Sequence, residues 1–471
     1  MKRVISLIVV LFTLVGIAEV SAQSRTSYFM EGSYFRTELN PALAPTRGYI
    51  AFPLISGIAI NNSSNYASIE NTRFYRDGEY LSGLHNSVTA EEFLAPLPNW
   101  CNQNLDMDIT LFGLGFYTKR TFWNLGINFH LTAESSESKD MLRHIKAADG
   151  SPYRGGFSEG ATGYFDAYIG AAFPVADWVT VGVKAKFLMG IVNVGYKATE
   201  VTAITRGDHV ESTLRGNWWG SAGGIDNSNI TPDGGYDGDV VVADAWYDLF
   251  KGIKSFGLAV DLGAEMRLVD DHLKLSAAIT DLGFIKWKPS THMVGDFESS
   301  YVPGGDGYFM SEQESYMRKP ENAGYTTRLN CAVNIGAEYN ILRNHIGFGL
   351  LSHTKMCNNF VMSELTASVN LRPTNWITAT LSHTFLNGNK AGIFGAALNI
   401  HPAGMNIFLG VDFIDMKYVR VSDYVKQTSC HQEYYIPHFV KGQRATSINV
   451  YAGFAFNFGR PKHLRAKPVR E

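Results

Sequence analysis

Apolar and polar residues alternate along many stretches of this chain. In Thr326–Tyr339 one face holds Thr327, Leu329, Cys331, Val333, Ile335, Ala337 and Tyr339, and the other holds Thr326, Arg328, Asn330, Ala332, Asn334, Gly336 and Glu338. A period of two is that of a β-strand with one apolar and one polar face. Lys254–Leu268 and Ala445–Gly459 alternate in the same way.

The pattern recurs and predicts an all-β transmembrane antiparallel β-barrel of about 14 strands. The predicted strands are Gly48–Ile60, Asp108–Thr118, Thr121–Thr132, Thr162–Phe173, Trp178–Val194, Lys254–Leu268, His272–Lys288, Thr326–Tyr339, His345–His353, Val361–Leu371, Asn375–Leu386, Ala391–His401, Met405–Met416 and Ala445–Gly459. Most are longer than the 5–6 residues usual in soluble strands, and long enough for a tilted span of about 9–11 residues. Their polar faces carry Gly, Ala, Asn, Ser and isolated charges rather than a dense Lys/Glu coat, which favours a barrel over a soluble sandwich.

The connections between these strands alternate in length. Short ones lie near Lys119, Val175–Asp177, Asp270–Asp271, Ile341–Asn344, Arg372–Thr374 and Pro402–Gly404. Long ones are Asn61–Met107, Ala133–Ala161, Gly195–Ile253, Pro289–Tyr325 and Lys417–Arg444. Two connections on the same side as the long ones are themselves short; they lie around Lys355–Phe360 and Asn387–Lys390. Outer-membrane barrels have short periplasmic turns and longer outer loops. The lengths of the connections therefore predict that the protein lies in the cell outer membrane, with both chain ends in the periplasm.

The N-terminus has the form of a secretory signal peptide, residues 1–22. Lys2 and Arg3 precede the apolar run Val4–Ala18, and Val20-Ser21-Ala22 forms a small-residue cleavage site. An anchoring helix is the alternative, but the run is shorter than the about 18–20 residues that a span needs. The chain has 471 residues with 18% charged residues and a net charge of −3, and this balance gives no sign of a nucleic-acid partner.

Little in the sequence predicts catalysis, a metal or a cofactor. It contains no GxSxG, HExxH, P-loop or dinucleotide-binding motif, and we expect no enzyme activity. His353 and His383 each lie in a Ser-His-Thr tripeptide; the two could face each other, but the simpler interpretation is that each is a histidine at a strand end near the membrane interface. An acidic loop could bind calcium or be merely solvated; its candidates are Asp226, Asp233, Asp237 and Asp239. Four cysteines are too few for a disulfide scaffold, although one pair among Cys101, Cys357 and Cys430 could form a bond.

Two further sets of residues have predicted positions in the barrel. Isolated charges on the polar faces are candidates to face the lumen: Asp261, Glu265, Arg267, Arg328, Glu338, Glu364 and Arg372. Aromatic residues near strand ends are candidates for the interfacial girdles of a membrane barrel, or else for ordinary packing: Tyr117, Trp123, Trp178, Trp287, Tyr339 and Trp376. The lumen charges would pair with one another or with a plug.

Two segments carry a resemblance to a known family. Ser27-Tyr28-Phe29-Met30, followed by Leu39-Asn40-Pro41-Ala42 and Pro45, resembles the plug segment of FadL-like long-chain fatty-acid transporters. Ala277–Trp287 (AAITDLGFIKW) looks like a signature of an uncharacterised FadL-like family of Bacteroidota outer membranes, to which the type IX secretion shuttle barrel is related in fold. The resemblance implies a plug at residues 23–47 inside a barrel at residues 48–459, with Asn40, Pro41 and Ala42 as the plug element.

The resemblance also implies a function. FadL-like barrels take up hydrophobic small molecules passively, so the expected partners are outer-membrane lipid and a hydrophobic small molecule. The alternative is a type IX secretion or envelope-assembly accessory that binds exported proteins through its long outer loops. A basic tail, Arg460–Glu471, follows the last strand where many outer-membrane proteins end on an aromatic residue. This tail could be solvated or could contact an anionic periplasmic partner.

Overall fold

The structure is a computed structural model of the 471-residue chain. It describes residues 25–53, 56–76, 79–83, 85, 87–147, 156–206, 209–222, 255–288, 292–299, 315–317, 324–386, 389–414, 418–419, 422–427, 432–437, 441–442 and 447–459. The predicted signal peptide and the basic tail lie outside these residues.

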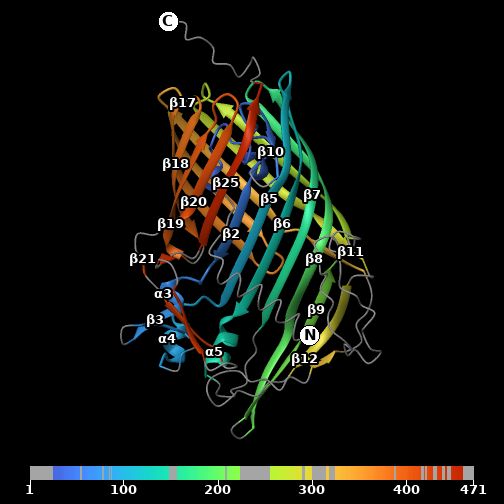
Figure 1. The fold of residues 1–471 in the computed structure, drawn as a ribbon, viewed down its shortest axis with the longest axis vertical. Helices are drawn as coiled ribbons and strands as arrows, with labels where there is room; N and C mark the ends of the chain where they lie inside the picture. Colours follow the sequence, from blue (N-terminus) through green and yellow to red (C-terminus); the bar gives the residue numbers. More distant parts are fainter. Residues whose placement is uncertain are drawn as a thin grey trace.

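The predicted fold class is confirmed, because the described strands close into a 14-stranded antiparallel barrel (Figure 1). Around the barrel run β1 (Gly48–Ala51) with β2 (Ile58–Ser64), β5 (Trp100–Thr118), β6 (Thr121–Ser138), β7 (Phe157–Ala176), β8 (Val179–Arg206), β10 (Ser255–Leu268), β11 (Leu273–Trp287), β14 (Tyr325–Arg328) with β15 (Cys331–Ile341), β16 (Ile346–Met356), β17 (Val361–Thr374), β18 (Ile377–Leu386), β19 (Asn389–Ile400), β20 (Asn406–Ile414) and β25 (Ser447–Phe458). Each of the predicted strands corresponds to one position in this barrel.

The first and last strands close the barrel. Gly48 at the start of β1 pairs with Phe458 at the end of β25, and Ile58 of β2 pairs with Ala452. The other edges of β1 and β2 pair with β5, so the first strand has a neighbour on each side. The start of β1 and the end of β25 therefore lie at one end of the barrel, and the short turns are at that same end (Figure 1). We call it the short-turn end.

Several strands continue past the predicted boundaries at the opposite end. β8 extends to Arg206, and β9 (His209–Ala222) forms a hairpin with it where the sequence predicted a loop. β9 pairs in turn with β12 (His292–Ser299), and β12 with β13 (Ser315–Met317). The prediction of a loop was wrong for these residues, because the run Val201-Thr202-Ala203-Ile204-Thr205 is rich in β-branched side chains that favour extended backbone.

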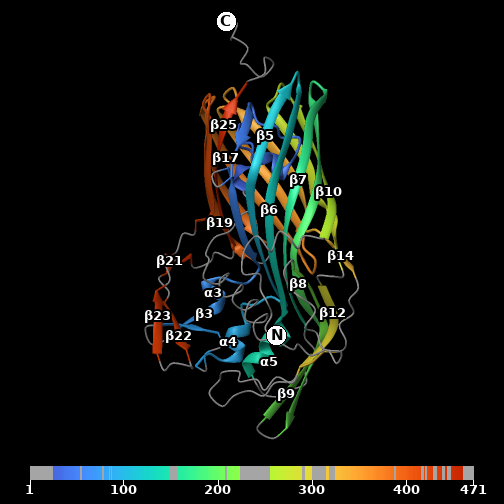
Figure 2. The same cartoon turned by 45° about the vertical axis from the view of Figure 1, so that its right-hand side comes forward.

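Small elements also lie at this opposite end (Figure 2). They are α3 (Ile69–Thr72), β3 (Arg73–Arg76), β4 (Glu79–Ser82), α4 (Ala90–Leu94) and α5 (Lys139–Ala147), together with β21 (Tyr418–Val419), β22 (Ser422–Gln427), β23 (Gln432–Pro437) and β24 (Lys441–Gly442). A separate apolar core supports the first group; its buried residues are Val88, Phe93, Leu94, Leu97 and Cys101. Thr89 begins α4 with a capping box to Glu92, which satisfies free backbone N–H groups at the helix start.

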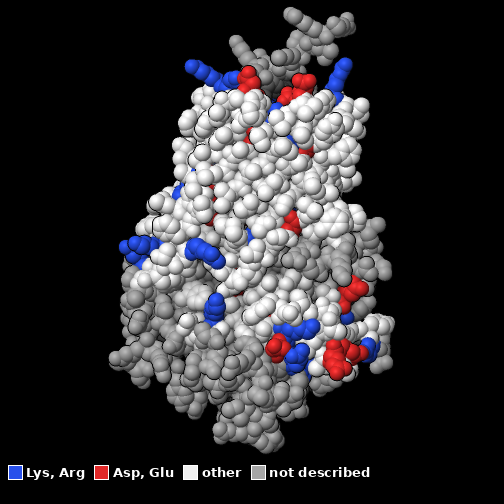
Figure 3. Space-filling model, turned by 180° about the vertical axis from the view of Figure 1, so that it is seen from behind, with Lys and Arg blue, Asp and Glu red and all other residues white. Residues whose placement is uncertain are grey.

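The outward face of the barrel is apolar. Along β10, for example, Leu258 is 58% exposed while its inward neighbour Ala259 is 7% exposed. Large side chains on neighbouring strands are exposed in the same way, among them Ile169, Phe187 and Ile335. Most of this surface is free of charge in Figure 3, and Lys, Arg, Asp and Glu gather at the short-turn rim and at the opposite end. A soluble protein rarely exposes so large a continuous apolar patch.

Among the helices of the described ranges, none is long and apolar enough to cross a membrane.

Local irregularities exchange the two faces of some strands. In β11 the inward positions are even-numbered up to Thr280 and odd-numbered from Ile285 onward, because the pairing with β10 shifts between Val260 and Leu262. The partner strand is likewise broken between β14 and β15, so Leu329 is buried while Val333 beyond the break faces outward. A bulge changes the identity of the residues that face each side without ending the strand.

This exchange corrects part of the aromatic prediction. Trp123, Trp178, Tyr339 and Trp376 are exposed, as residues of an interfacial girdle should be. Two others point inward instead: Trp287 is buried and donates from Nε1 to Thr327 Oγ1 at 2.8 Å, and the Tyr117 hydroxyl donates to the Pro45 carbonyl at 2.6 Å. Both follow a bulge in their strand, which the alternation alone does not reveal.

Candidate functional site

The N-terminal segment, Arg25–Arg47, lies inside the barrel near its short-turn end (Figure 1). It contains η1 (Arg25–Ser27) and α2 (Arg36–Leu39). Its aromatic side chains pack on inward-facing residues of the wall, as where Tyr34 stacks on Tyr49 with ring centroids 4.4 Å apart. Most of the segment is buried, so it fills this part of the lumen with side chains and backbone.

Asn40, Pro41 and Ala42, predicted as the plug element, contact three neighbouring strands. The Asn40 Nδ2 donates to the carbonyls of Ala264 on β10 and Ala277 on β11, both at 3.4 Å. The Asn40 Oδ1 accepts from the Ala42 N–H at 2.9 Å, which fixes the turn around the proline. Asn40 is completely buried, so these bonds satisfy an amide that water does not reach.

Glycines in the wall give this turn its close approach. A Cβ at Gly182 of β8 would lie 2.2 Å from the backbone of Pro41 and Ala42, and one at Gly263 of β10 would lie 2.0 Å from Asn40 Oδ1. These distances are far below van der Waals contact, so no other residue fits at either position without movement of the segment. Gly182 and Gly263, on the polar faces of β8 and β10, therefore form part of the surface against which the segment packs.

Ion pairs join the segment to the wall at several points. Arg25 pairs with Glu364, and Glu31 pairs with Lys274. Glu38 pairs with Lys184 at 2.8 Å. Burial by itself would raise the pKa of the Glu31 carboxyl, but the positive charges of Lys274 and Arg372 outweigh it and hold that pKa well below its usual range.

A chamber lies between the N-terminal segment and the end of the barrel that carries the long connections. It has about 1030 Å³ of empty space, counting the part open to solvent, and about 90 Å³ that admits the centre of a water molecule. Phe35, Glu38 and Leu39 of the segment form part of its lining. The rest comes from inward-facing residues of β2, β5, β6, β7, β8, β11, β15 and β16, from Arg328 and the β14–β15 break that follows it, and from Asn358. The chamber is therefore narrow and suits a small molecule or a thin chain.

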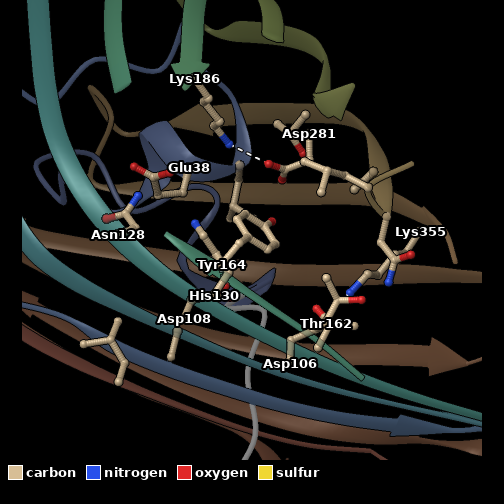
Figure 4. Close-up of a pocket in the computed structure, with 18 of the residues that line it drawn as sticks. Glu38, Asp106, Asp108, Asn128, His130, Thr162, Tyr164, Lys186, Asp281 and Lys355 are labelled. Atoms are coloured by element: carbon tan, nitrogen blue, oxygen red, sulfur yellow. Dashed lines mark hydrogen bonds and ion pairs between the residues drawn. The ribbon is translucent and has the colours of Figure 1, made fainter. Parts of the chain in front are cut away.

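Ionisable side chains from different strands meet in this chamber (Figure 4). On one side, Lys355 of β16 pairs with Asp106 of β5 at 2.5 Å. The same carboxylate also accepts hydrogen bonds from Thr132, Asn61 and Asn104 at 3.0, 2.7 and 2.6 Å. Such complete satisfaction is what a buried charge pair requires.

His130 of β6 lies between two carboxylates. Its Nδ1 is 2.5 Å from Asp108 Oδ1, and its Nε2 is 3.2 Å from Asp166 Oδ2. The Tyr164 ring stacks on the imidazole with centroids 4.9 Å apart. Because both ring nitrogens face carboxylates, the arrangement favours the doubly protonated, cationic imidazole.

A third cluster joins β8, β10 and β11. The Lys186 ammonium is 3.0 Å from Asp261 and 2.7 Å from Asp281, and the Asp281 backbone N–H donates to Asp261 at 2.8 Å. Asp281 lies within the predicted signature Ala277–Trp287 and has φ of +59°, a left-handed conformation in which Asp is one of the commoner residues. The signature therefore corresponds to the bulge of β11 and to a charged group beside the chamber.

The seven predicted lumen charges occupy different environments. Five are buried on the inward face: Asp261, Glu265, Glu338, Glu364 and Arg372. Arg372 pairs with Glu338 at 2.5 Å and donates to the Phe29 carbonyl at 3.0 Å, so these residues support the segment rather than the chamber. Arg267 has a side chain 43% exposed beside Glu265. Arg328 on β14 is exposed, lines the chamber and donates to the carbonyls of Cys357 and Asn358.

Most of the chamber residues were absent from the predicted set. The residues that were not predicted each lie on the polar face of a strand: Asp106, Asp108, His130, Lys186 and Lys355. Their alternation with apolar neighbours is the signal that could have found them. His353 lines the chamber and lies on β16, whereas His383 on β18 packs between Phe385 and Phe394, so the two Ser-His-Thr histidines do not form a pair.

The structure describes only some of the residues for which the sequence allowed a metal site or a disulfide bond. Within the ranges that the structure covers, no cluster of His, Cys, Asp and Glu could hold a metal ion. The possible calcium ligands Asp226, Asp233, Asp237 and Asp239 lie outside those ranges, as does Cys430. Cys101, Cys331 and Cys357 are free thiols.

Together, the fold and lumen define a closed transmembrane-type β-barrel whose interior is polar and partly filled by its own N-terminal segment. The chain belongs to a family of unknown function, DUF5723, which it matches over residues 41–412. No curated protein matches it.

Solved structures with a similar arrangement are barrels of low identity. The TodX monoaromatic hydrocarbon channel deltaS2 mutant is 8% identical with a TM-score of 0.41, over 89% of this chain and 93% of that chain. A Pseudomonas aeruginosa FadL homologue is 9% identical with a TM-score of 0.36, over 91% of this chain and 94% of that chain. The Pseudomonas putida toluene transporter TodX is 6% identical with a TM-score of 0.35, over 94% and 95%. At such values, the likeness carries no conclusion about cargo or mechanism.

Proposed function

We propose that this protein is an outer-membrane channel for small molecules. The observation that supports this proposal is the contrast between the two faces of the barrel wall. The outer face is apolar, with exposed residues such as Leu258 and Ile169, and the lumen is lined by paired charges. An apolar belt of this kind buries itself in lipid, and a polar interior admits water and polar groups. In this proposal the short-turn end, with the start of β1 and the end of β25, faces the periplasm.

The N-terminal segment acts as the plug in this proposal. It lies between the chamber and the short-turn end, and it is held by ion pairs and hydrogen bonds rather than by a covalent link. Asn40, Pro41 and Ala42 seat it against Gly182 and Gly263. A molecule that enters the chamber from outside reaches the periplasm only when this segment moves.

The cargo follows from the lining of the chamber. A hydrophobic cargo, which the FadL-like resemblance implies, requires an apolar lumen pocket. The chamber offers apolar contact through Phe35, Leu39, Ile109 and Leu329, but polar residues surround these. An apolar groove with about 940 Å³ of empty space, counting the part open to solvent, lies on the outer wall instead. Ile127, Ile169, Phe187 and Leu258 are among the residues that line it. We therefore propose a small amphipathic cargo.

Conductance of the purified protein in a planar lipid bilayer tests the channel proposal. We expect a low conductance for the intact protein and a higher one for a variant that lacks residues 25–47. The matched control is Gly160→Ala, because a Cβ there meets only ordinary contacts at 3.5 Å or more. If both the intact and the shortened barrel are folded, as shown by a heat-dependent shift in electrophoretic mobility, and neither conducts ions, the proposal is wrong.

A second candidate is an accessory barrel that binds exported proteins or secretion-system subunits. The observation in its favour is the sheet formed by β8, β9, β12 and β13, which projects past the barrel (Figure 2). Affinity purification from detergent extracts distinguishes the two candidates. A stoichiometric partner that is lost when residues 201–219 are deleted supports the accessory function, and a barrel that is isolated alone and conducts ions supports the channel.

A further inference from the structure

Two buried hydrogen-bond acceptors in the chamber have no hydrogen-bond partner within the described ranges. They are His353 Nε2 and Asn128 Oδ1. His353 is 2% exposed and Asn128 is 3% exposed, and both line the chamber. A buried polar atom that lacks a partner costs about 1–3 kcal/mol relative to one that has it, so a group that donates to these atoms binds favourably.

The surrounding hydrogen bonds determine which form of the His353 imidazole is present. Asn334 Nδ2 donates to the Leu39 carbonyl at 2.8 Å, which fixes the orientation of that amide. Asn334 Oδ1 is then an acceptor, so the His353 Nδ1 at 2.7 Å must carry the hydrogen. In the neutral ring, Nε2 is left with a lone pair, and this lone pair is the acceptor that lines the chamber.

The charged groups of the chamber already have partners. Lys355 pairs with Asp106, Lys186 with Asp261 and Asp281, and His130 with Asp108 and Asp166. Two carboxylates remain: that of Glu38 pairs with Lys184 at 2.8 Å, and that of Glu134 accepts from Asn330 Nδ2 at 2.5 Å and from the Asn358 N–H at 3.2 Å. Arg328 donates to the carbonyls of Cys357 and Asn358. The unmatched atoms are therefore both neutral acceptors, and a neutral hydroxyl matches them without disturbing the ion pairs.

We propose that the chamber contains a subsite for a small neutral molecule that bears hydroxyl groups, with His353 Nε2 and Asn128 Oδ1 as the acceptors of its hydrogen bonds. This inference rests on the proposed channel function and specifies the polar part of its cargo. Phe35, Leu39 and Ile109 supply the apolar contact for the carbon skeleton. Because His353 bonds through Asn334 to the Leu39 carbonyl, the subsite adjoins the N-terminal segment directly.

Nitrogen NMR of the full-length protein, labelled with ¹⁵N-histidine in detergent micelles, tests the subsite. The ring signals of His353 are assigned from their loss in His353→Asn and again in His353→Gln, so that the assignment does not depend on one variant. Ethylene glycol is the hydroxyl probe, and 1,2-dimethoxyethane, which has no donor, is the matched control. We expect the unprotonated Nε2 signal to move saturably with ethylene glycol and to stay in place with the diether. The saturable shift should weaken in Asn128→Leu.

Three results would overturn the subsite. One is a protonated Nε2 in the free protein, and another is an equal, unsaturable response to the diol and the diether, which means that only water reaches the ring. The third is a saturable response to ethylammonium chloride but not to ethylene glycol, which would assign a cationic ligand. Conductance of the same preparation distinguishes failure of the subsite from failure of the channel proposal. A barrel that conducts ions but shows no saturable shift supports the channel and contradicts the subsite. A barrel that shows the shift but does not conduct supports the subsite and contradicts the channel.

Discussion

The Lys186 ammonium donates to the Asp281 carboxylate at 2.7 Å, and Asp281 makes this contact from a left-handed backbone conformation with φ of +59°. The bulge that carries Asp281 separates the two halves of β11, in which opposite sets of residues face the lumen. One residue thus combines a backbone role, which redirects the strand, with a charge that faces Lys186 from β8.

Substitution of Asp281 should separate these two roles. Asn tolerates the left-handed region, so Asp281→Asn removes only the charge and should lower the free energy of unfolding by about 2 kcal/mol, the worth of a hydrogen bond to a charged group. Asp281→Ala adds a backbone cost and should lose about 1 kcal/mol more. Urea titration of the barrel in lipid vesicles measures both. Asp270→Asn, at an exposed turn residue with φ of +52°, is the control and should have little effect; equal losses in Asn and Ala would contradict the backbone role.

Gly182→Ala should displace the N-terminal segment. The new Cβ would lie 2.2 Å from backbone atoms of Pro41 and Ala42, which cannot rotate away as a side chain would. Overpacking of this kind typically costs about 1–3 kcal/mol, so the segment should become more accessible to protease and the conductance should rise. Gly160→Ala is the matched control. A Gly182→Ala protein with unchanged protease resistance would show that the segment is not seated where the structure places it.

The docking of the segment should weaken in acid through Glu31. Its pKa in the folded protein is held below the usual value, despite burial, by Lys274 and Arg372. Its stabilising effect is therefore fully present above the unfolded pKa of about 4.3 and is lost as the pH falls through the lower folded-state pKa. Conductance should rise over that acid range. Glu31→Gln should already conduct more at pH 7 and should respond less to acid.

The control for this pH experiment is Glu91→Gln, an exposed position on α4 outside the lumen. It should keep the pH response of the unaltered protein. If Glu31→Gln retains the full rise in acid, another group controls the segment.

A charge on the outer wall should cost the most near mid-barrel if that wall contacts lipid. Leu262 is 43% exposed and lies near the middle of β10. Leu262→Arg should lower the free energy of unfolding in vesicles by about 2–4 kcal/mol, whereas Trp178→Arg at the short-turn end should lower it by only about 0–1 kcal/mol. Guanidinium titration in vesicles compares the two. Equal small losses would mean that the wall is not embedded in lipid.

The strands of the barrel could be predicted because alternation is a local property of the chain. Each wall strand has one apolar face and one polar face, and residues of the two faces alternate along the sequence. On β10, for example, Leu258 belongs to the apolar face and Asp261 to the polar face. The chamber could not be predicted in this way. Asp106 and Lys355 are 249 residues apart in the sequence, and only the closed topology brings β5 and β16 to face each other.

The bulges limited the prediction for a different reason. An inserted residue moves every later side chain of the strand to the opposite face of the sheet. The sequence around Trp287 and Tyr117 contains no local feature from which this change of face could be predicted. The tripeptide Thr280-Asp281-Leu282 was visible as part of a signature, but its backbone conformation was not. The hairpin of β8 and β9 was missed because long connections were expected at that end.

The pairing of Gly48 with Phe458 has a consequence for biogenesis. The last strand joins the first across 410 positions of sequence, so the wall is complete only after the whole chain is available. Arg25–Arg47 immediately precedes the first strand and lies within the closed wall. The segment joins β1 at this same seam, so a segment docked in the lumen holds Gly48 close to the position at which it pairs with Phe458 of the last strand.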